Sequence, residues 1–152
     1  MAGILAAEAD AVSAFVILLK EEQDVLRNGN PDALPGILER KSAVAQTLPS
    51  LTSARAKAFS RLGAADGTEG IENWLTDRPA EDPILNGWQR LKALAEEARE
   101  LNRVNGLLIQ MRMQVNNQAL EILRNAASSC QDLYGADGQA APGSIKRIID
   151  SA

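Results

Sequence analysis

Residues 101–127 read LNRVNGLLIQMRMQVNNQALEILRNAA, and this stretch decides the fold. It lies within a longer segment, from Asp82 to Tyr134, that holds no proline after Pro83. Apolar side chains recur every seven residues along that segment, at Leu94, Leu101, Leu108, Val115 and Ile122. Because this spacing places them along one side of an α-helix, it predicts a single continuous helix with an apolar seam.

The predicted helix is long for a protein of 152 residues. About 50 residues at 1.5 Å per residue would extend roughly 75 Å. Ordinary globular helices have about three turns, and a domain of this size cannot bury such a length. We therefore expect part of the helix to protrude, or to pack against something outside the chain.

A second line of residues beside the seam is apolar at both ends and polar in the middle, where it carries Asn102, Asn105 and Asn116. Asparagine is a mediocre helix former, and Gly106 costs about 1 kcal/mol relative to alanine. These residues either lie on a solvated face or fix the register of the helix. Alternatively, they form a polar groove for a partner's backbone, with Gly106 allowing close approach. The sequence leaves both interpretations open.

The composition indicates an all-α protein, since hydrophobic residues make up 45% of the chain but aromatic residues only 3%. We expect an antiparallel helical bundle or coiled coil with two N-terminal helices, a short connecting helix and one very long C-terminal helix. The bundle domain should cover residues 1–134, followed by a tail over residues 135–152. In that tail, Ile145, Ile148 and Ile149 share one helical face and need a surface to cover, on this bundle or on another protein.

The first helix is expected over residues 2–28, ending at a left-handed Gly29. Its inward stripe should comprise Ile4, Ala7, Ala11, Phe15, Leu18 and Leu19, followed by Val25 or Leu26. Residues 1–30 have a net charge of −3 and residues 31–65 a net charge of +3, which favours antiparallel packing of the first two helices.

The second helix is expected over residues 31–63, beginning with Asn30 as its N-cap and Pro31 in its first turn. One line of this helix carries Leu34, Leu38, Lys41, Ala45, Leu48, Arg55, Phe59 and Leu62. Lys41 and Arg55 are expected to reach outward along their stems. Pro49 should kink or interrupt the helix.

Residues 63–70 have the composition of a flexible link, and residues 71–76 that of a short helix. This short helix should carry Trp74 and Leu75 inward, with Trp74 and Trp88 packing near one another as core residues. Asp82 is expected to cap the long helix, and Pro83 to occupy its first position.

Several classes of function lack support in the sequence. The chain has no histidine, so it cannot use a Ser-His-Asp or Cys-His arrangement. Its single cysteine, Cys130, lacks neighbouring metal ligands and suits a packed position. There is no phosphate-binding glycine motif and no basic patch for nucleic acid. The apolar N-terminus is interrupted by Glu8 and Asp10, and we expect it to be too short and too broken to span a bilayer. We therefore expect a cytoplasmic, non-enzymatic protein without cofactor, metal or membrane insertion.

Particular residues give the chain a resemblance to a known family. The first helix holds Leu18-Leu19-x-x-Glu22-Gln23-x-x-Leu26 before Gly29, and the second has Leu34, Ile37, Lys41, Leu48, Leu51 and Arg55 at wide, regular spacing. The long helix has Trp88, then Leu101-Asn102-x-x-Asn105-Gly106-x-Leu108-Ile109-x-x-Arg112, Ala119-Leu120-x-x-Leu123 and finally Tyr134-Gly135-x-x-Gly138. Over about residues 15–138 the chain resembles the FlgN family of flagellar export chaperones.

The resemblance implies a cytosolic chaperone that binds hook-associated proteins of the hook–filament junction, keeps them unassembled before type III export, and contacts the export apparatus. The C-terminal region is generally where such chaperones bind their substrates. From the seam and the resemblance together we expect partner binding at Asn102, Asn105, Gly106, Leu108, Ile109, Arg112, Val115, Ile122, Tyr134, Ile145, Ile148 and Ile149. The alternative is a structural coiled-coil protein whose seam serves only homodimerisation.

Overall fold

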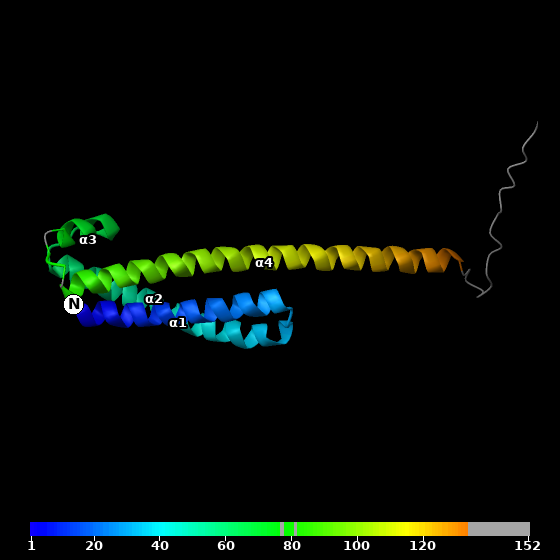
Figure 1. The fold of residues 1–152 in the computed structure, drawn as a ribbon, viewed down its shortest axis with the longest axis horizontal. Helices are drawn as coiled ribbons and strands as arrows, with labels where there is room; N and C mark the ends of the chain where they lie inside the picture. Colours follow the sequence, from blue (N-terminus) through cyan, green and yellow to red (C-terminus); the bar gives the residue numbers. More distant parts are fainter. Residues whose placement is uncertain (77, 81, 134–152) are drawn as a thin grey trace, which may run out of the picture. The chain divides into compact units, whose positions relative to one another are not determined.

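The computed structural model describes residues 1–76, 78–80 and 82–133, with side chains up to residue 128. Its helices are α1 (Ala2–Asn28), a 3-10 turn η1 (Pro31–Ala33), α2 (Leu34–Arg61), α3 (Gly67–Leu75) and α4 (Pro83–Leu133). The residues described contain no strand, so the prediction of an all-α chain with one very long last helix is confirmed (Figure 1). By its contacts the chain divides within α4, into Met1–Ile109 and a second unit that begins at Gln110. The predicted boundary between bundle and tail, after residue 134, falls where the described residues end and stays a prediction.

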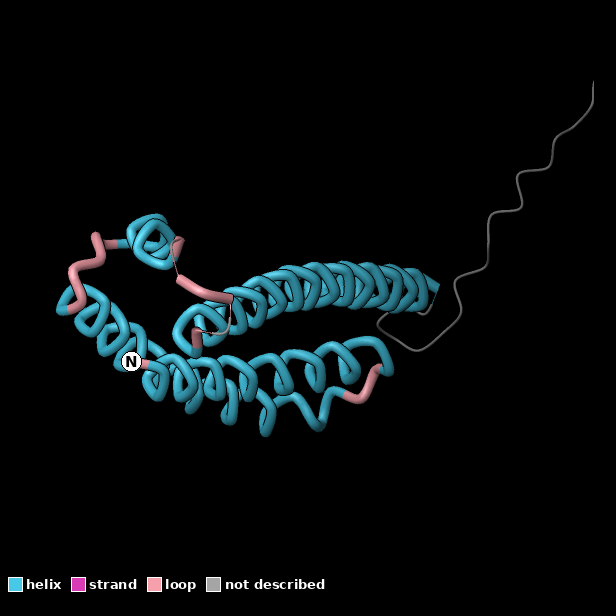
Figure 2. Tube along the Cα trace, turned by 60° about the vertical axis from the view of Figure 1, so that its left-hand side comes forward, coloured by secondary structure: helices cyan, strands magenta, loops and turns pink. Residues whose placement is uncertain are grey.

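Helices α1 and α2 lie side by side and run in opposite directions (Figures 1 and 2). Gly29 ends α1 in the left-handed conformation, with φ 76° and ψ 26°, as the sequence predicts. Its N–H donates a hydrogen bond to the carbonyl of Val25 at 3.1 Å, which satisfies one of the last carbonyls of the helix. Asn30 and Pro31 then begin η1 rather than α2 itself. The position predicted for the start of the second helical segment is therefore correct, although a 3-10 turn precedes the α-helix.

Two ion pairs inside the bundle join α1 to α2. Glu8 and Glu22 are buried, and their carboxylates bind Arg55 Nε at 2.7 Å and Lys41 Nζ at 2.6 Å. The prediction that Lys41 and Arg55 reach outward is wrong, because two buried carboxylates of α1 draw them inward. Both the two acids and the two bases are separated by about four helical turns. The pairs therefore match only when the two helices are in one register.

The apolar core gathers where α3 meets the other helices. It comprises Leu5, Ala9, Phe59, Ala64, Ile71, Leu75, Trp88 and Leu91. Phe59 is its centre, with ring centroids 5.7 Å from Trp74 and 6.0 Å from Trp88 in edge-to-face geometry. The two tryptophans thus share Phe59 as a neighbour. Leu5 lies against Gly87, where an added Cβ would come within 3.2 Å of the leucine Cβ.

The predicted inward stripes are right only in part. Leu18, Leu19 and Leu26 are buried, but Ala7 is exposed, and the centre of the α1 stripe lies at Leu5, Ala9 and Val16. In α2 the residues Leu38 and Leu62 are exposed, whereas Ile37 is buried. The error is one of phase, because helical spacing gives the period of a stripe more reliably than the direction in which it faces.

Two predictions about helix interruptions need correction. Pro49 was predicted to kink or interrupt its helix, and the second of these is wrong, because α2 continues across Pro49. Helix α3 begins at Gly67, inside the segment predicted to be a flexible link. Gly70 is needed in this helix because an added Cβ would lie 2.3 Å from the carbonyl oxygen of Ala65. The glycines that suggested a link therefore serve a tight turn into a helix.

Helix α1 is long and apolar enough to cross a membrane by length and composition alone. The expectation that this segment is too short to span a bilayer is therefore wrong. In this structure α1 lies in the middle of the bundle, since its side chains pack on α2 and on the first half of α4. Its two buried glutamates are matched by bases of α2, as a bundle helix requires.

The start of α4 follows the sequence prediction. Asp82 Oδ1 accepts a hydrogen bond from the Ile84 N–H at 2.7 Å, and Asp82 Oδ2 accepts one from Arg78 at 2.7 Å. The hydrogen bond from Arg78, followed by that from the Ile84 amide, lowers the pKa of Asp82 below its ordinary value. Asp82 is therefore a charged cap on the positive end of the helix dipole.

Candidate interaction surface

An exposed row of large apolar side chains lies on α4 beyond Ile109. We call it the apolar strip, and it comprises Met111, Met113, Val115, Leu120, Ile122 and Leu123. These six side chains are between 59% and 68% exposed, and every described side chain from Gln110 to Ser128 is exposed. Such a concentration of apolar surface is typical of a site that another chain covers.

The strip occupies a broad sector of the helix rather than a narrow line. Met111, Val115 and Ile122 lie on the face of the seven-residue seam. Met113 and Leu120, also seven residues apart, form a second series about 150° around the helix from Val115. Leu123 lies between the two series. A sector of this width suits contact with more than one neighbouring helix, or with one helix that packs deeply.

Amide side chains surround the strip and charges are few. Between residues 110 and 125 the charged residues are Arg112, Glu121 and Arg124, while the amides are Gln110, Gln114, Asn116, Asn117, Gln118 and Asn125. Amides can donate and accept hydrogen bonds at the edge of an apolar contact. With few charges at its edges, contact with this surface should depend little on salt.

The predicted partner-binding residues that lie at or before Ile109 differ in how far the structure exposes them. Asn105 is 1% exposed, and its Nδ2 donates hydrogen bonds of 2.8 Å to both the Leu19 carbonyl and the Glu22 carboxylate. It therefore lies inside the bundle, where it fixes α4 against α1, and not in a polar groove open to a partner. Asn102 and Ile109 are exposed, and Leu108 is half-buried. Gly106 has open space where a Cβ would be, so no close approach within the bundle explains it.

The remaining predicted residues lie beyond Ile109. Arg112, Val115 and Ile122 are exposed on the same part of α4 as the strip. Tyr134, Ile145, Ile148 and Ile149 lie outside the described residues, as does the predicted tail helix. The predicted set omitted Met111, Met113, Leu120 and Leu123. The second seven-residue series through Met113 and Leu120 was the signal that would have found part of this group.

The buried acids of the described bundle are engaged in ion pairs. The buried carboxylates, Glu8 and Glu22, are each bound by a base of α2. Among the described side chains, those of residues 1–128 without 77 and 81, no three metal-ligand side chains gather. The chemistry that the arrangement supports is noncovalent protein binding, and the protein is of the class of helical bundles with an exposed apolar helix.

Comparisons with known proteins then give the family. Residues 1–142 match the family described as FlgN protein. The flagella synthesis protein FlgN of Yersinia enterocolitica is 30% identical over 143 residues, which cover 93% of this chain and 89% of that relative. The Salmonella typhimurium protein of the same name is 34% identical over 124 residues, covering 80% and 76%, and the Escherichia coli K12 protein is 30% identical over 136 residues, covering 86% and 85%. No solved structure matches significantly.

The chain therefore belongs to the FlgN family, a family of flagellar chaperones. The resemblance noted from its motifs is confirmed. This membership places the protein in flagellum synthesis.

Proposed function

We propose that this protein is a cytoplasmic export chaperone for hook-associated proteins of the hook–filament junction. In this proposal it holds their terminal helical segments until the export apparatus receives them, and so prevents assembly before type III export. The observation that carries the proposal is the apolar strip, because the family membership gives flagellum synthesis but no client site.

The strip suits a client segment that folds as it binds. An amphipathic helix of the client would lay its apolar face on Met111, Val115 and Ile122, and the flanking amides would hydrogen-bond to its polar edge. Folding of a disordered segment on binding costs several kcal/mol of the interaction energy. That cost keeps the complex reversible, which release during export requires. The proposal extends the client surface to Tyr134, Ile145, Ile148 and Ile149.

The test is a titration of the full chain with isolated N- and C-terminal segments of hook-associated proteins. We expect Ile122→Glu with Leu123→Glu to weaken binding by at least tenfold, because two buried carboxylates would lack partners. The matched control is Gln110→Glu with Gln114→Glu, which adds the same charge to the same helix on its polar side and should change binding little. Equal binding by both variants would remove the strip from the proposed site.

The alternative is a coiled-coil protein that uses the strip only for homodimerisation. It rests on the same exposed seam, and sedimentation over a range of concentrations separates the two functions. Under the chaperone proposal, added client segment replaces self-association with a chaperone–client complex. A tight dimer that excludes every client segment would favour the structural alternative.

A further inference from the structure

The apolar strip has two faces that point in different directions. At about 100° per residue, Met111 and Ile122 lie within roughly 40° of Val115, and these three residues form what we call the seam face. Met113 and Leu120 lie about 150° further around α4, and we call them the second face. A helix packed on one side of another covers a stripe about 100° wide. One client helix on the seam face would therefore leave the second face uncovered.

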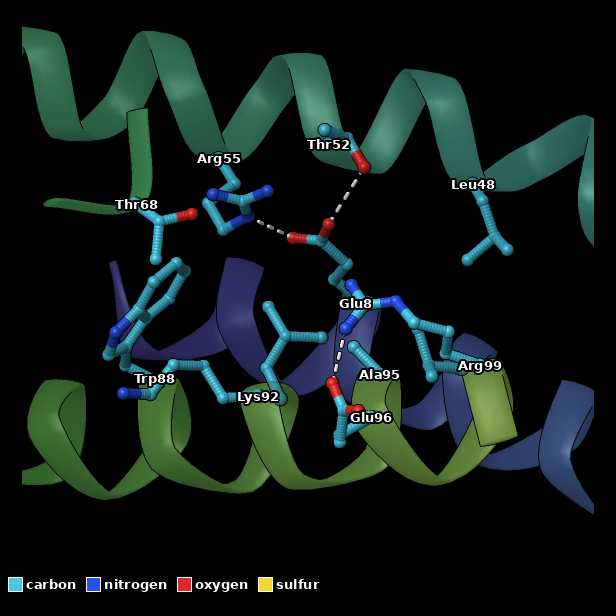
Figure 3. A pocket seen from close by; sticks show the side chains of 12 residues that line it. Glu8, Leu48, Thr52, Arg55, Thr68, Trp88, Lys92, Ala95, Glu96 and Arg99 are labelled. Carbon is cyan, nitrogen blue, oxygen red and sulfur yellow. Dashed lines mark hydrogen bonds and ion pairs between the residues drawn. The ribbon is translucent and has the colours of Figure 1, made fainter. Parts of the chain in front are cut away.

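The first half of α4 packs against two helices at once. Gly87 lies against Leu5 of α1, and the Trp88 ring is 6.0 Å from the Phe59 ring of α2. Arg55 of α2 also lies over the Trp88 ring, and side chains of α1, α2 and α4 line one pocket there (Figure 3). Gly87 and Trp88 are neighbours in sequence, so they point about 100° apart. Two directions on α4 thus correspond to two neighbouring helices in the bundle.

Small side chains lie between the two faces of the strip. Ala119, Leu123 and Ala127 follow one another at about 40°, 80° and 120° from Val115. All three are exposed. The distance between two packed helices depends on the size of the side chains at their contact. Because Ala119 and Ala127 fill little space, two helices can lie on the strip at the same time, with Leu123 between them.

The tail of this chain carries an apolar segment of a size that suits the second face. Ile145, Ile148 and Ile149 are spaced three and four apart, which places them on one side of a short helix. As a helix, residues 144–152 would be about 13.5 Å long, and a helix of that length is not stable in water without a surface to cover. The second face is also short, since its two residues are about 10.5 Å apart along α4. The seam face, in contrast, continues a seam that begins at Leu94 and suits a longer helix.

The length of the connection allows the tail to reach the second face. Residues 134–143 connect α4 to this segment, and they include three glycines and a proline, which do not favour continuation of the helix. A flexible chain of ten residues has an end-to-end distance of about 16–19 Å. A helix that turns back along α4 with Ile148 beside Leu120 would begin roughly 16 Å from the end of α4. A connection that matches the span in this way gives an effective concentration in the millimolar range.

We propose that residues 144–152 of this chain bind the second face of α4 and form one wall of the client site. The isoleucines of the segment cover Leu120 and Met113, while the seam face stays open for the client helix. The three helices α4, tail and client then pack together, as α4, α1 and α2 do in the bundle. The tail contact with α4 forms without a client, whereas the identity of the third helix rests on the proposed function.

The first test follows the methyl chemical shifts of the full chain without a client. Ile145→Asp with Ile148→Asp should release the tail, and so shift the methyl signals of Leu120. The matched control is Ser144→Asp with Ser151→Asp, which adds the same charge to the polar side of the same segment and should leave Leu120 unchanged. An unchanged Leu120 signal in the isoleucine variant, or an equal change in both variants, would overturn the proposal.

Two other results of this test would assign the surfaces differently and refute the proposal. A change at Val115 as large as that at Leu120 would mean that the tail covers the seam face and competes with the client. Dilution of the unaltered chain should leave the Leu120 signal in place, because binding of a tethered segment does not depend on protein concentration. A Leu120 signal that moves on dilution to its position in the isoleucine variant would assign the second face to another copy of the chain.

A client titration tests whether the tail is a wall of the client site. The isoleucine variant and Leu120→Glu should each weaken binding of a hook-associated segment about three- to tenfold, and their combination should weaken it no further, because both remove the same contact. The serine control should bind as the unaltered chain does. Losses that add in the combined variant, or tighter binding by the isoleucine variant, would contradict the wall. If no client segment binds while the Leu120 shift is present, the proposed function fails and the tail contact stands.

Discussion

The two halves of α4 have the same sequence pattern and opposite surroundings. Trp88 and Leu91 are 4% and 6% exposed, whereas Ile122, on the same helix, is 68% exposed. Along the seven-residue series, Leu94, Leu101 and Leu108 are half-buried and Val115 and Ile122 are exposed. The difference teaches that a periodic apolar seam shows which face of a helix is suited to packing against another helix. It does not show whether the same chain supplies that second helix.

The reason for the difference is length. Helices α1 and α2 have 27 and 28 residues and extend about 40 Å each, while α4 has 51 residues and extends about 76 Å. Leu5 packs on Gly87, and the Leu19 carbonyl binds Asn105, so the packed part of α4 is the part that α1 accompanies. The strip comes after the residues of α4 that these contacts hold.

Truncation of one apolar residue in each half should give the largest contrast. Trp88→Ala removes a buried ring from the core around Phe59 and should lower the free energy of unfolding by about 3–5 kcal/mol. Leu123→Ala removes an exposed side chain and should change it by no more than about 0.5 kcal/mol. Urea unfolding, followed by circular dichroism, measures both. Similar losses would mean that the strip is covered in the free protein.

The next contrast concerns the buried polar contacts of Glu22 with Lys41 and Asn105, which hold the packed half of α4. Lys41→Met leaves the buried Glu22 with only Asn105 as its partner, and should cost about 3 kcal/mol of unfolding free energy. Replacing both members, Glu22→Leu with Lys41→Met, should restore most of that stability, because no unpaired charge remains. A double variant as unstable as the single one would show that this ion pair is itself a net source of stability.

Two glycines give a smaller contrast of opposite sign. Gly106→Ala should raise the free energy of unfolding by about 0.5–1 kcal/mol, because alanine favours a helix and its Cβ would meet open space. Gly70→Ala should lower it by about 1–3 kcal/mol, because its Cβ would clash with the Ala65 carbonyl. Thermal unfolding of the two variants side by side provides the measurement. A destabilising Gly106→Ala would indicate that something approaches α4 closely at that point.

The smallest expected effect is the acid sensitivity of the start of α4. Because the folded protein lowers the pKa of Asp82, the charged carboxylate stabilises the fold at pH values above its ordinary pKa of 3.8. That contribution is lost as the pH falls through the lower pKa of the folded state. The stability difference between the unaltered chain and Asp82→Asn should therefore be constant near neutral pH and shrink below about pH 4. A difference that grows on acidification would contradict the assigned cap.

The sequence predicted local features well and long-range pairings poorly. Gly29, Asp82 and Pro83 were placed correctly because caps and first turns depend on residues only a few positions away. Lys41, Arg55 and Asn105 were misplaced, because their partners lie on other helices and no periodic pattern says which helix meets which. The strip was located in part, through Val115 and Ile122, since the seam is visible in one sequence while its exposure is not.

What the sequence by itself determined is the class of the fold, both ends of α1, the start of α4 and the presence of an apolar seam too long for the rest of the chain. Those properties follow from helical period, capping chemistry and length. Only the tertiary structure decided that two glutamates of α1 hold bases inside the bundle, that Asn105 belongs to the core, and that the side chains from Gln110 to Ser128 are uncovered. The burial of a side chain depends on which distant parts of the chain pack against it, and the periodic pattern of a sequence does not specify those neighbours.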